Sequence, residues 1–148
     1  MSTKEEIIEF LATEFPQSTI SVVEVGNHGA TVIQEIGSEQ LRPGGTVSGP
    51  VLMAAADSAL YVAILGEIGL VPLAVTTSFN INFLRKPFAD RAIIGKCNLL
   101  KIGKVLVVGE VYLYSEGQEE PVAHAVGTYS IPPGNDMQLV KSNAVQSS

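Results

Sequence analysis

The chain has 148 residues, 46% of them hydrophobic and 16% charged, which suits one globular domain and excludes a disordered segment. Its net charge of −6 argues against a nucleic acid or a membrane surface as partner, because both are negatively charged. The single cysteine, Cys97, excludes an internal disulfide and fits a cytoplasmic location. The acidic residues 1–6 do not resemble a secretory signal peptide.

The first third of the chain predicts a short helix followed by a β-hairpin. Residues 3–14 carry apolar side chains on one side and glutamates on the other, a pattern typical of an amphipathic helix that ends before Pro16. Residues 19–25 and 30–36 are rich in β-branched residues, and the sequence Gly-Asn-His-Gly between them favours a tight turn. Residues 37–49 are rich in glycine and predict a loop.

The central feature is a helix over residues 51–65 that is apolar on every side and carries a single charge, Asp57. Ser48 or Gly49 is suited to cap it, and Pro50 suits its first turn. The segment is shorter than the about 20 apolar residues that a membrane span needs, and Asp57 would lie near its middle. We therefore expect protein, rather than lipid, to surround this helix.

Four strands are predicted after the helix, over residues 73–85, 91–102, 105–114 and 122–131. In the first of these, strict alternation places Thr77 as the one polar side chain on an apolar face. A long buried helix followed by grouped strands indicates an α+β fold with a five- to six-stranded antiparallel sheet wrapped around the helix. We expect one domain over residues 1–134 and a polar tail over 135–148. Because one curved sheet of this size cannot cover the helix fully, we also expect a dimer.

The segment that opens the helix resembles the active-site segment of PaaI-like hotdog-fold acyl-CoA thioesterases. Residues 45–50 read Gly-Thr-Val-Ser-Gly-Pro and are followed by Asp57. The family pattern is approximately Asn-x-x-Gly-Thr-x-His-Gly-Gly, with an aspartate seven residues after the last glycine. The resemblance extends through the strand at 75–87 and the closing strand at 122–129.

This resemblance implies a hydrolase that cleaves acyl-CoA thioesters without a metal or other cofactor. It also implies homodimers joined edge to edge, often paired into tetramers, with the site between two subunits. Asp57 maps to the family's general base or nucleophile, and the Gly49 amide maps to its oxyanion donor. A Ser or Thr from the following strand of a second subunit falls on Thr77.

The chain departs from the family pattern at three positions near this site. Arg42 replaces the asparagine, Ser48 replaces the histidine and Pro50 replaces the second glycine. These residues are candidates for contacts with the substrate, although Ser48 is also a good N-cap. Arg85 and Lys86 follow the strand that carries Thr77 and are candidates for binding the coenzyme A phosphates.

The sequence is also compatible with two alternative functions. A catalytically weak or silent acyl-CoA-binding protein would fit the three replaced positions. An enoyl-CoA hydratase needs a histidine paired with an acid near the helix, and the family's histidine position holds Ser48. His28 and His124 are expected to be structural, and the spacing of histidines, cysteine and acids does not suggest a metal site.

Overall fold

In the computed structural model, the described residues are 2–37, 41–42, 46–70 and 74–132. Two helices and eight strands form in this part of the chain. In chain order they are α1 (Lys4–Glu14), β1 (Ile20–Gly26), β2 (Gly29–Gln34), β3 (Leu41–Arg42), β4 (Thr46–Val47), α2 (Gly49–Ile68), β5 (Val75–Phe83), β6 (Ile93–Ile102), β7 (Leu106–Ser115) and β8 (Ala123–Ser130). The predicted tail, 135–148, lies outside the described residues.

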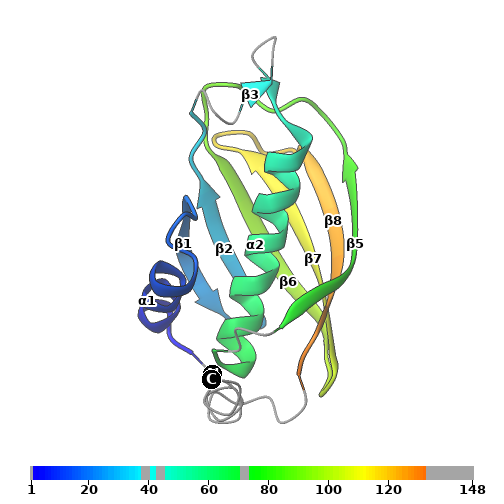
Figure 1. The fold of residues 1–148 in the computed structure, drawn as a ribbon. Helices are drawn as coiled ribbons and strands as arrows, with labels where there is room; N and C mark the ends of the chain where they lie inside the picture. Colours follow the sequence, from blue (N-terminus) through cyan, green and yellow to red (C-terminus); the bar gives the residue numbers. More distant parts are fainter. Residues whose placement is uncertain (1, 38–40, 43–45, 71–73, 133–148) are drawn as a thin grey trace.

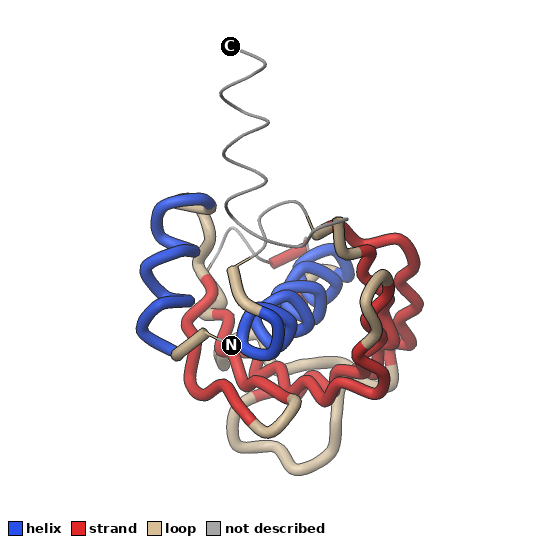
Figure 2. The backbone as a smooth tube through the Cα atoms, turned by 90° about the horizontal axis from the view of Figure 1, so that it is seen from below, coloured by secondary structure: helices blue, strands red, loops and turns tan. Residues whose placement is uncertain are grey.

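The long helix α2 lies against the concave face of a six-stranded antiparallel sheet of order β1-β2-β6-β7-β8-β5 (Figure 1). The view along α2 in Figure 2 shows the strands curving around it, with α1 on the flank of the sheet. This arrangement confirms the predicted α+β fold. The chain crosses from α2 to the far edge of the sheet, where β5 pairs only with β8 among the described strands.

Helix α2 has the predicted capping residues and extends a few residues beyond the predicted range, 51–65, at each end. The Ser48 hydroxyl accepts a hydrogen bond from the Val51 amide at 3.3 Å, and Pro50 occupies the first turn. Gly69 ends the helix with φ at +106°, a conformation that glycine adopts readily. By length and composition α2 could span a membrane, but 61% of its most apolar window is buried inside the protein, as in a core helix.

Glycines in the sheet allow α2 to approach it closely. The Leu60 side chain is fully buried and lies over Gly109 and Gly127, which are paired neighbours on β7 and β8. A Cβ added at Gly109 would lie 2.6 Å from Leu60 Cδ1, and one added at Gly127 would lie 2.7 Å from Leu60 Cδ2. The height of α2 above the strands therefore depends on these two residues having no side chain.

The N-terminal helix is held by local capping and by packing. Thr3 and Glu6 form a reciprocal capping box at the start of α1. Ile7 and Phe10 are buried in the same core as α2. The predicted loop at 37–49 is more structured than expected, since β3 and β4 pair within it.

The strand after the helix does not alternate as the sequence predicts. The pairing of β5 with β8 shifts register between Thr76 and Ser78, so that Thr77 is an extra residue in a β-bulge. Thr76 pairs with Tyr129, and Ser78 pairs with Thr128. The bulge places Thr76 on the same face as Phe79, which faces the helix, and overturns the prediction that Thr77 lies there.

Candidate functional site

Asp57 lies in the middle of α2 on a face that the sheet leaves partly uncovered. Its side chain is half-buried, whereas Ala56 and Leu60 beside it are fully buried. The prediction that the helix is enclosed thus holds for most of its circumference, and the acid occupies the less enclosed part. A carboxylate there has protein partners and also access to a ligand.

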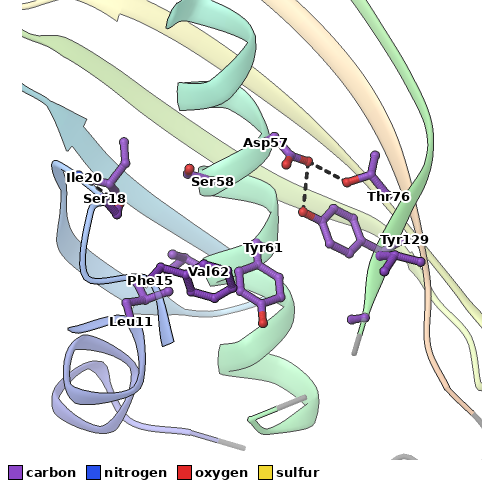
Figure 3. A pocket seen from close by; sticks show the side chains of 12 residues that line it. Leu11, Phe15, Ser18, Ile20, Asp57, Ser58, Tyr61, Val62, Thr76 and Tyr129 are labelled. Carbon is purple, nitrogen blue, oxygen red and sulfur yellow. Dashed lines mark hydrogen bonds between the residues drawn. The ribbon is translucent and has the colours of Figure 1, made fainter. Parts of the chain in front are cut away.

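Two hydroxyl groups converge on one oxygen of this carboxylate (Figure 3). Thr76 Oγ1 donates to Asp57 Oδ1 at 2.9 Å, and Tyr129 Oη donates to the same oxygen at 2.9 Å. The Thr77 hydroxyl donates instead to the backbone carbonyl of Thr128 at 3.3 Å. Within one chain, therefore, Thr76 is the threonine that contacts Asp57, because the bulge turns it inward. That Thr77 of a second subunit meets Asp57 stays a prediction.

A cavity of about 500 Å³ adjoins Asp57 between α1, α2 and β5. Its lining is mainly apolar and includes three aromatic rings, Phe15, Tyr61 and Tyr129. The rings form a contact series, with Phe15 edge-on to Tyr61 and Tyr61 stacked on Tyr129, each pair with centroids 5.8 Å apart. The remaining lining residues are Leu11, Ser18, Ile20, Asp57, Ser58, Val62, Ala74, Val75 and Thr76.

The two tyrosines at the cavity keep their protons across the ordinary pH range. Burial, and then the negative charge of Asp57, raises the pKa of Tyr129 far above its usual value. Burial, with a smaller effect from Glu14, raises the pKa of Tyr61 to about 12. The hydroxyl of Tyr129 is therefore a constant hydrogen-bond donor to Asp57, because an ionised carboxylate only accepts.

The cavity lining does not include Ser48, Gly49 or Pro50 at the helix N-terminus. Gly49 is the first residue of α2, and its Cα faces the ring of Phe83 on β5. Ser48 is the N-cap and Pro50 is exposed, while Arg42 lies in β3. Gly49 precedes Asp57 by eight residues, which separates them by about 12 Å along the helix axis.

The basic pair after β5 divides into an anchored and an exposed residue. The Arg85 guanidinium forms an ion pair with Glu120 at 3.0 Å and donates a hydrogen bond to the Pro121 carbonyl. Lys86 is exposed. Arg85 thereby ties the end of β5 to the segment that precedes β8, a role that was not predicted from the sequence.

The histidines lie away from Asp57. His124 Nε2 is 2.9 Å from Glu110 Oε1, but both residues lie on the face of the sheet opposite to α2, because their buried neighbours in β7 and β8 face the helix. His28 pairs with Glu67 at 3.0 Å near the end of α2. The described part of the chain contains no cluster of three acids, histidines or cysteines that could hold a metal ion.

Sequence reasoning missed Thr76 and Tyr129. Alternation over residues 122–131 was a usable signal for Tyr129, since it places this polar aromatic residue on the buried face of the last strand. No comparable signal existed for Thr76, because adjacent threonines do not reveal which of them is the bulge residue.

Residues 44–122 match the thioesterase superfamily. A protein from Silicibacter sp. TM1040, provisionally described as a thioesterase, is 41% identical, with a TM-score of 0.82 over 88% of this chain and 92% of its own. No curated sequence matches the chain.

More distant structures share the fold. The PaaI protein of the E. coli phenylacetic acid degradation operon is 22% identical, with a TM-score of 0.69 over 85% of this chain and 90% of its own. Zebrafish thioesterase superfamily member 2 is 19% identical, with a TM-score of 0.77 over 88% of this chain and 99% of its own. Together with the family match, these similarities confirm the predicted hotdog fold of the PaaI-like type.

Proposed function

The chain belongs to the thioesterase superfamily, and from this membership we propose that it hydrolyses acyl-CoA thioesters to a free acid and coenzyme A, with Asp57 as the reacting acid. One observation carries the proposal. The central helix presents a half-buried carboxylate, held by two hydroxyl donors, at the wall of an apolar cavity. That combination brings a base or nucleophile to a place that would accept an apolar acyl group.

The cavity is of a size and character suited to the acyl part of the substrate. Its volume of about 500 Å³ lies within the range of small-molecule sites, and its lining is mainly apolar. The acyl group would lie against Tyr61 and Phe15, with its thioester carbonyl next to Asp57. The coenzyme A part would extend out of the cavity, where Arg85 and Lys86 of the partner subunit are proposed to meet its phosphates, because within one chain they follow the opposite end of β5.

Two chemical routes lead from the thioester to the free acid and coenzyme A. As a general base, Asp57 takes a proton from water while the water oxygen bonds to the thioester carbon. The C–S bond then breaks, and the coenzyme A thiolate leaves and takes up a proton. As a nucleophile, the carboxylate itself bonds to that carbon and expels the thiolate, and water then cleaves the resulting anhydride.

The position of Gly49 supports a site built from two subunits. A thioester carbonyl beside Asp57 cannot also reach the Gly49 amide of the same helix, about 12 Å away along its axis. In a homodimer, a second subunit would bring its own helix N-terminus, with the amide and the helix dipole, to this carbonyl. The free edge of β5, with Val75 and Phe83 exposed, is the proposed contact, and pairing of two dimers would give a tetramer.

The test is release of free thiol from a series of acyl-CoA thioesters by the wild type and by Asp57→Asn. The asparagine keeps the volume and still accepts the hydrogen bonds of Thr76 and Tyr129, so the fold should be retained. We expect kcat to fall by roughly 10² to 10⁴. An asparagine variant as active as the wild type would overturn the assignment, and calorimetric binding without turnover would favour a silent acyl-CoA-binding protein.

A single turnover in ¹⁸O-labelled water tests for a nucleophilic route in which water cleaves the anhydride at the Asp57 carboxyl carbon; label on the acid product alone is compatible with both routes. A general base leaves the carboxylate of Asp57 unlabelled, because the label passes from water directly to the acid product. A nucleophilic carboxylate that is regenerated by attack of water on its own carbon acquires the label. Mass spectrometry of the peptide that contains Asp57 reads out the result.

A further inference from the structure

The carboxylate of Asp57 is held asymmetrically. Both hydroxyl donors, Thr76 Oγ1 and Tyr129 Oη, reach Oδ1 at 2.9 Å. Figure 3 shows the other oxygen, Oδ2, turned away from the two donors. A carboxylate whose first oxygen is fixed by two donors from different strands has little freedom to rotate, so its two oxygens are no longer equivalent.

Tyr129 is the more enclosed of the two donors. Its side chain is 4% exposed, and its ring stacks on Tyr61 with an angle of 19° between the planes. The hydroxyl also stays protonated, because burial and the charge of Asp57 both favour its neutral form. Thr76, in contrast, lies exposed on the edge strand β5 and depends on the bulge for its inward direction.

We propose that Tyr129 is a positioning residue, which together with Thr76 occupies Oδ1 of Asp57 and so makes Oδ2 the oxygen that reacts. This inference rests on the proposed thioester hydrolysis and adds which atom performs it. Oδ2 either receives the proton of the attacking water or bonds to the thioester carbon. In both routes Oδ1 keeps its two hydrogen bonds, which hold Oδ2 in a productive direction.

The test compares Tyr129→Phe with the wild type in steady-state hydrolysis. Phenylalanine keeps the buried ring and its stacking and removes only the hydroxyl. We expect kcat to fall roughly 10- to 100-fold while KM changes less than about twofold, because the hydroxyl orients the reacting group and does not bind the acyl chain. Tyr114→Phe is the matched control, since Tyr114 lies on the opposite face of the sheet, beside Lys96, and its loss of a hydroxyl should leave kcat unchanged.

A second readout does not depend on activity. The chain contains three aspartates, Asp57, Asp90 and Asp136. Selective ¹³C labelling of the aspartate side-chain carboxyl carbon therefore gives three resonances, and Asp57→Asn identifies the resonance of Asp57. We expect Tyr129→Phe to move the Asp57 resonance and to leave the other two in place, with Thr76→Val producing a shift of the same kind. Tyr114→Phe should move none of them.

The outcomes separate this inference from the proposed function. If the wild type hydrolyses no acyl-CoA, the proposed function fails, and an Asp57 resonance that still moves in Tyr129→Phe supports the positioning contact. If the wild type is active but Tyr129→Phe keeps full kcat, or if the Asp57 resonance stays where it was, the positioning role is overturned. A rise in KM alone would also overturn it, because it would make Tyr129 a binding residue.

Discussion

The contact between Leu60 and the paired glycines of β7 and β8 offers a quantitative test of how α2 is positioned. In Gly127→Ala the new Cβ would lie 2.7 Å from Leu60 Cδ2 and 3.1 Å from Phe79 Cδ2. Ordinary contact begins at 3.4 Å, so the methyl groups must separate by roughly 0.7 Å. Leu60 has little room to move toward Gly109, because its Cδ1 already packs against that glycine, only 2.6 Å from where a Cβ would lie.

The expected cost follows from two opposing effects. Overpacking of a close-fitting core lowers the free energy of unfolding by about 1–3 kcal/mol. Replacing a strand glycine by alanine raises it by about 0.5–1 kcal/mol, because the unfolded chain loses conformational freedom. The net loss in the free energy of unfolding is therefore at most about 2.5 kcal/mol, with a central value of about 1 kcal/mol. For a chain of this length, this loss lowers the Tm by at most about 10 °C.

A double-mutant cycle with Leu60→Ala tests the physical cause. Leu60→Ala alone should cost about 2.7–5.0 kcal/mol, since it removes a fully buried side chain and leaves a cavity. In that background the methyl group of Gly127→Ala keeps only its contact with Phe79 at 3.1 Å, so the substitution should cost clearly less than in the wild type. The assay is urea unfolding followed by circular dichroism at one protein concentration. An equal cost of Gly127→Ala in both backgrounds would refute steric contact with Leu60 as the cause.

Three further predictions concern the site and its surroundings. Thr76→Val is expected to lower kcat for thioester hydrolysis at least roughly tenfold, whereas Thr77→Val should keep most of it; the reverse order would support the role that the family resemblance gives to Thr77 of a second subunit. Ser48→Ala removes the N-cap of α2 and should lower the free energy of unfolding by about 0.5–2 kcal/mol in urea titrations; an unchanged midpoint would show that the cap contributes nothing. Burial raises the pKa of the Cys97 thiol to about 12, so at pH 8 its thiolate fraction is about three orders of magnitude below that of a free cysteine, and Ellman's reagent should label the native protein correspondingly slowly. Rapid labelling would show that Cys97 is accessible.

The most specific proposal from the structure concerns how one acid is prepared for its reaction. Asp57 alone on an apolar helix indicates a functional carboxylate but does not say which oxygen reacts. The hydroxyls of Thr76 and Tyr129 both approach Oδ1, and this is the basis of the proposal that Oδ2 reacts. The same geometry explains how the chain retains an oriented acid although the neighbouring family positions hold Arg42, Ser48 and Pro50.

Much of the fold could be predicted from the sequence because its signals are local. Helix α2 follows from a continuous apolar stretch with Ser48 before it and glycines after it, and the observed helix, Gly49–Ile68, extends a few residues beyond the prediction at each end. The strands follow from β-branched residues and turn signals. Asp57 could be singled out because a lone charge on such a helix is unusual in any packing arrangement.

Tertiary structure alone decided the partners of that acid. Strand alternation is a local rule, and it named Thr77; the bulge that selects Thr76 instead arises from the register between β5 and β8, which are about 50 residues apart in the chain. Tyr129 reaches Asp57 because Gly109 and Gly127 let Leu60 and the whole of α2 settle close to the sheet. A sequence can therefore indicate that a carboxylate is functional, but which hydroxyls orient it depends on pairing and packing between distant segments.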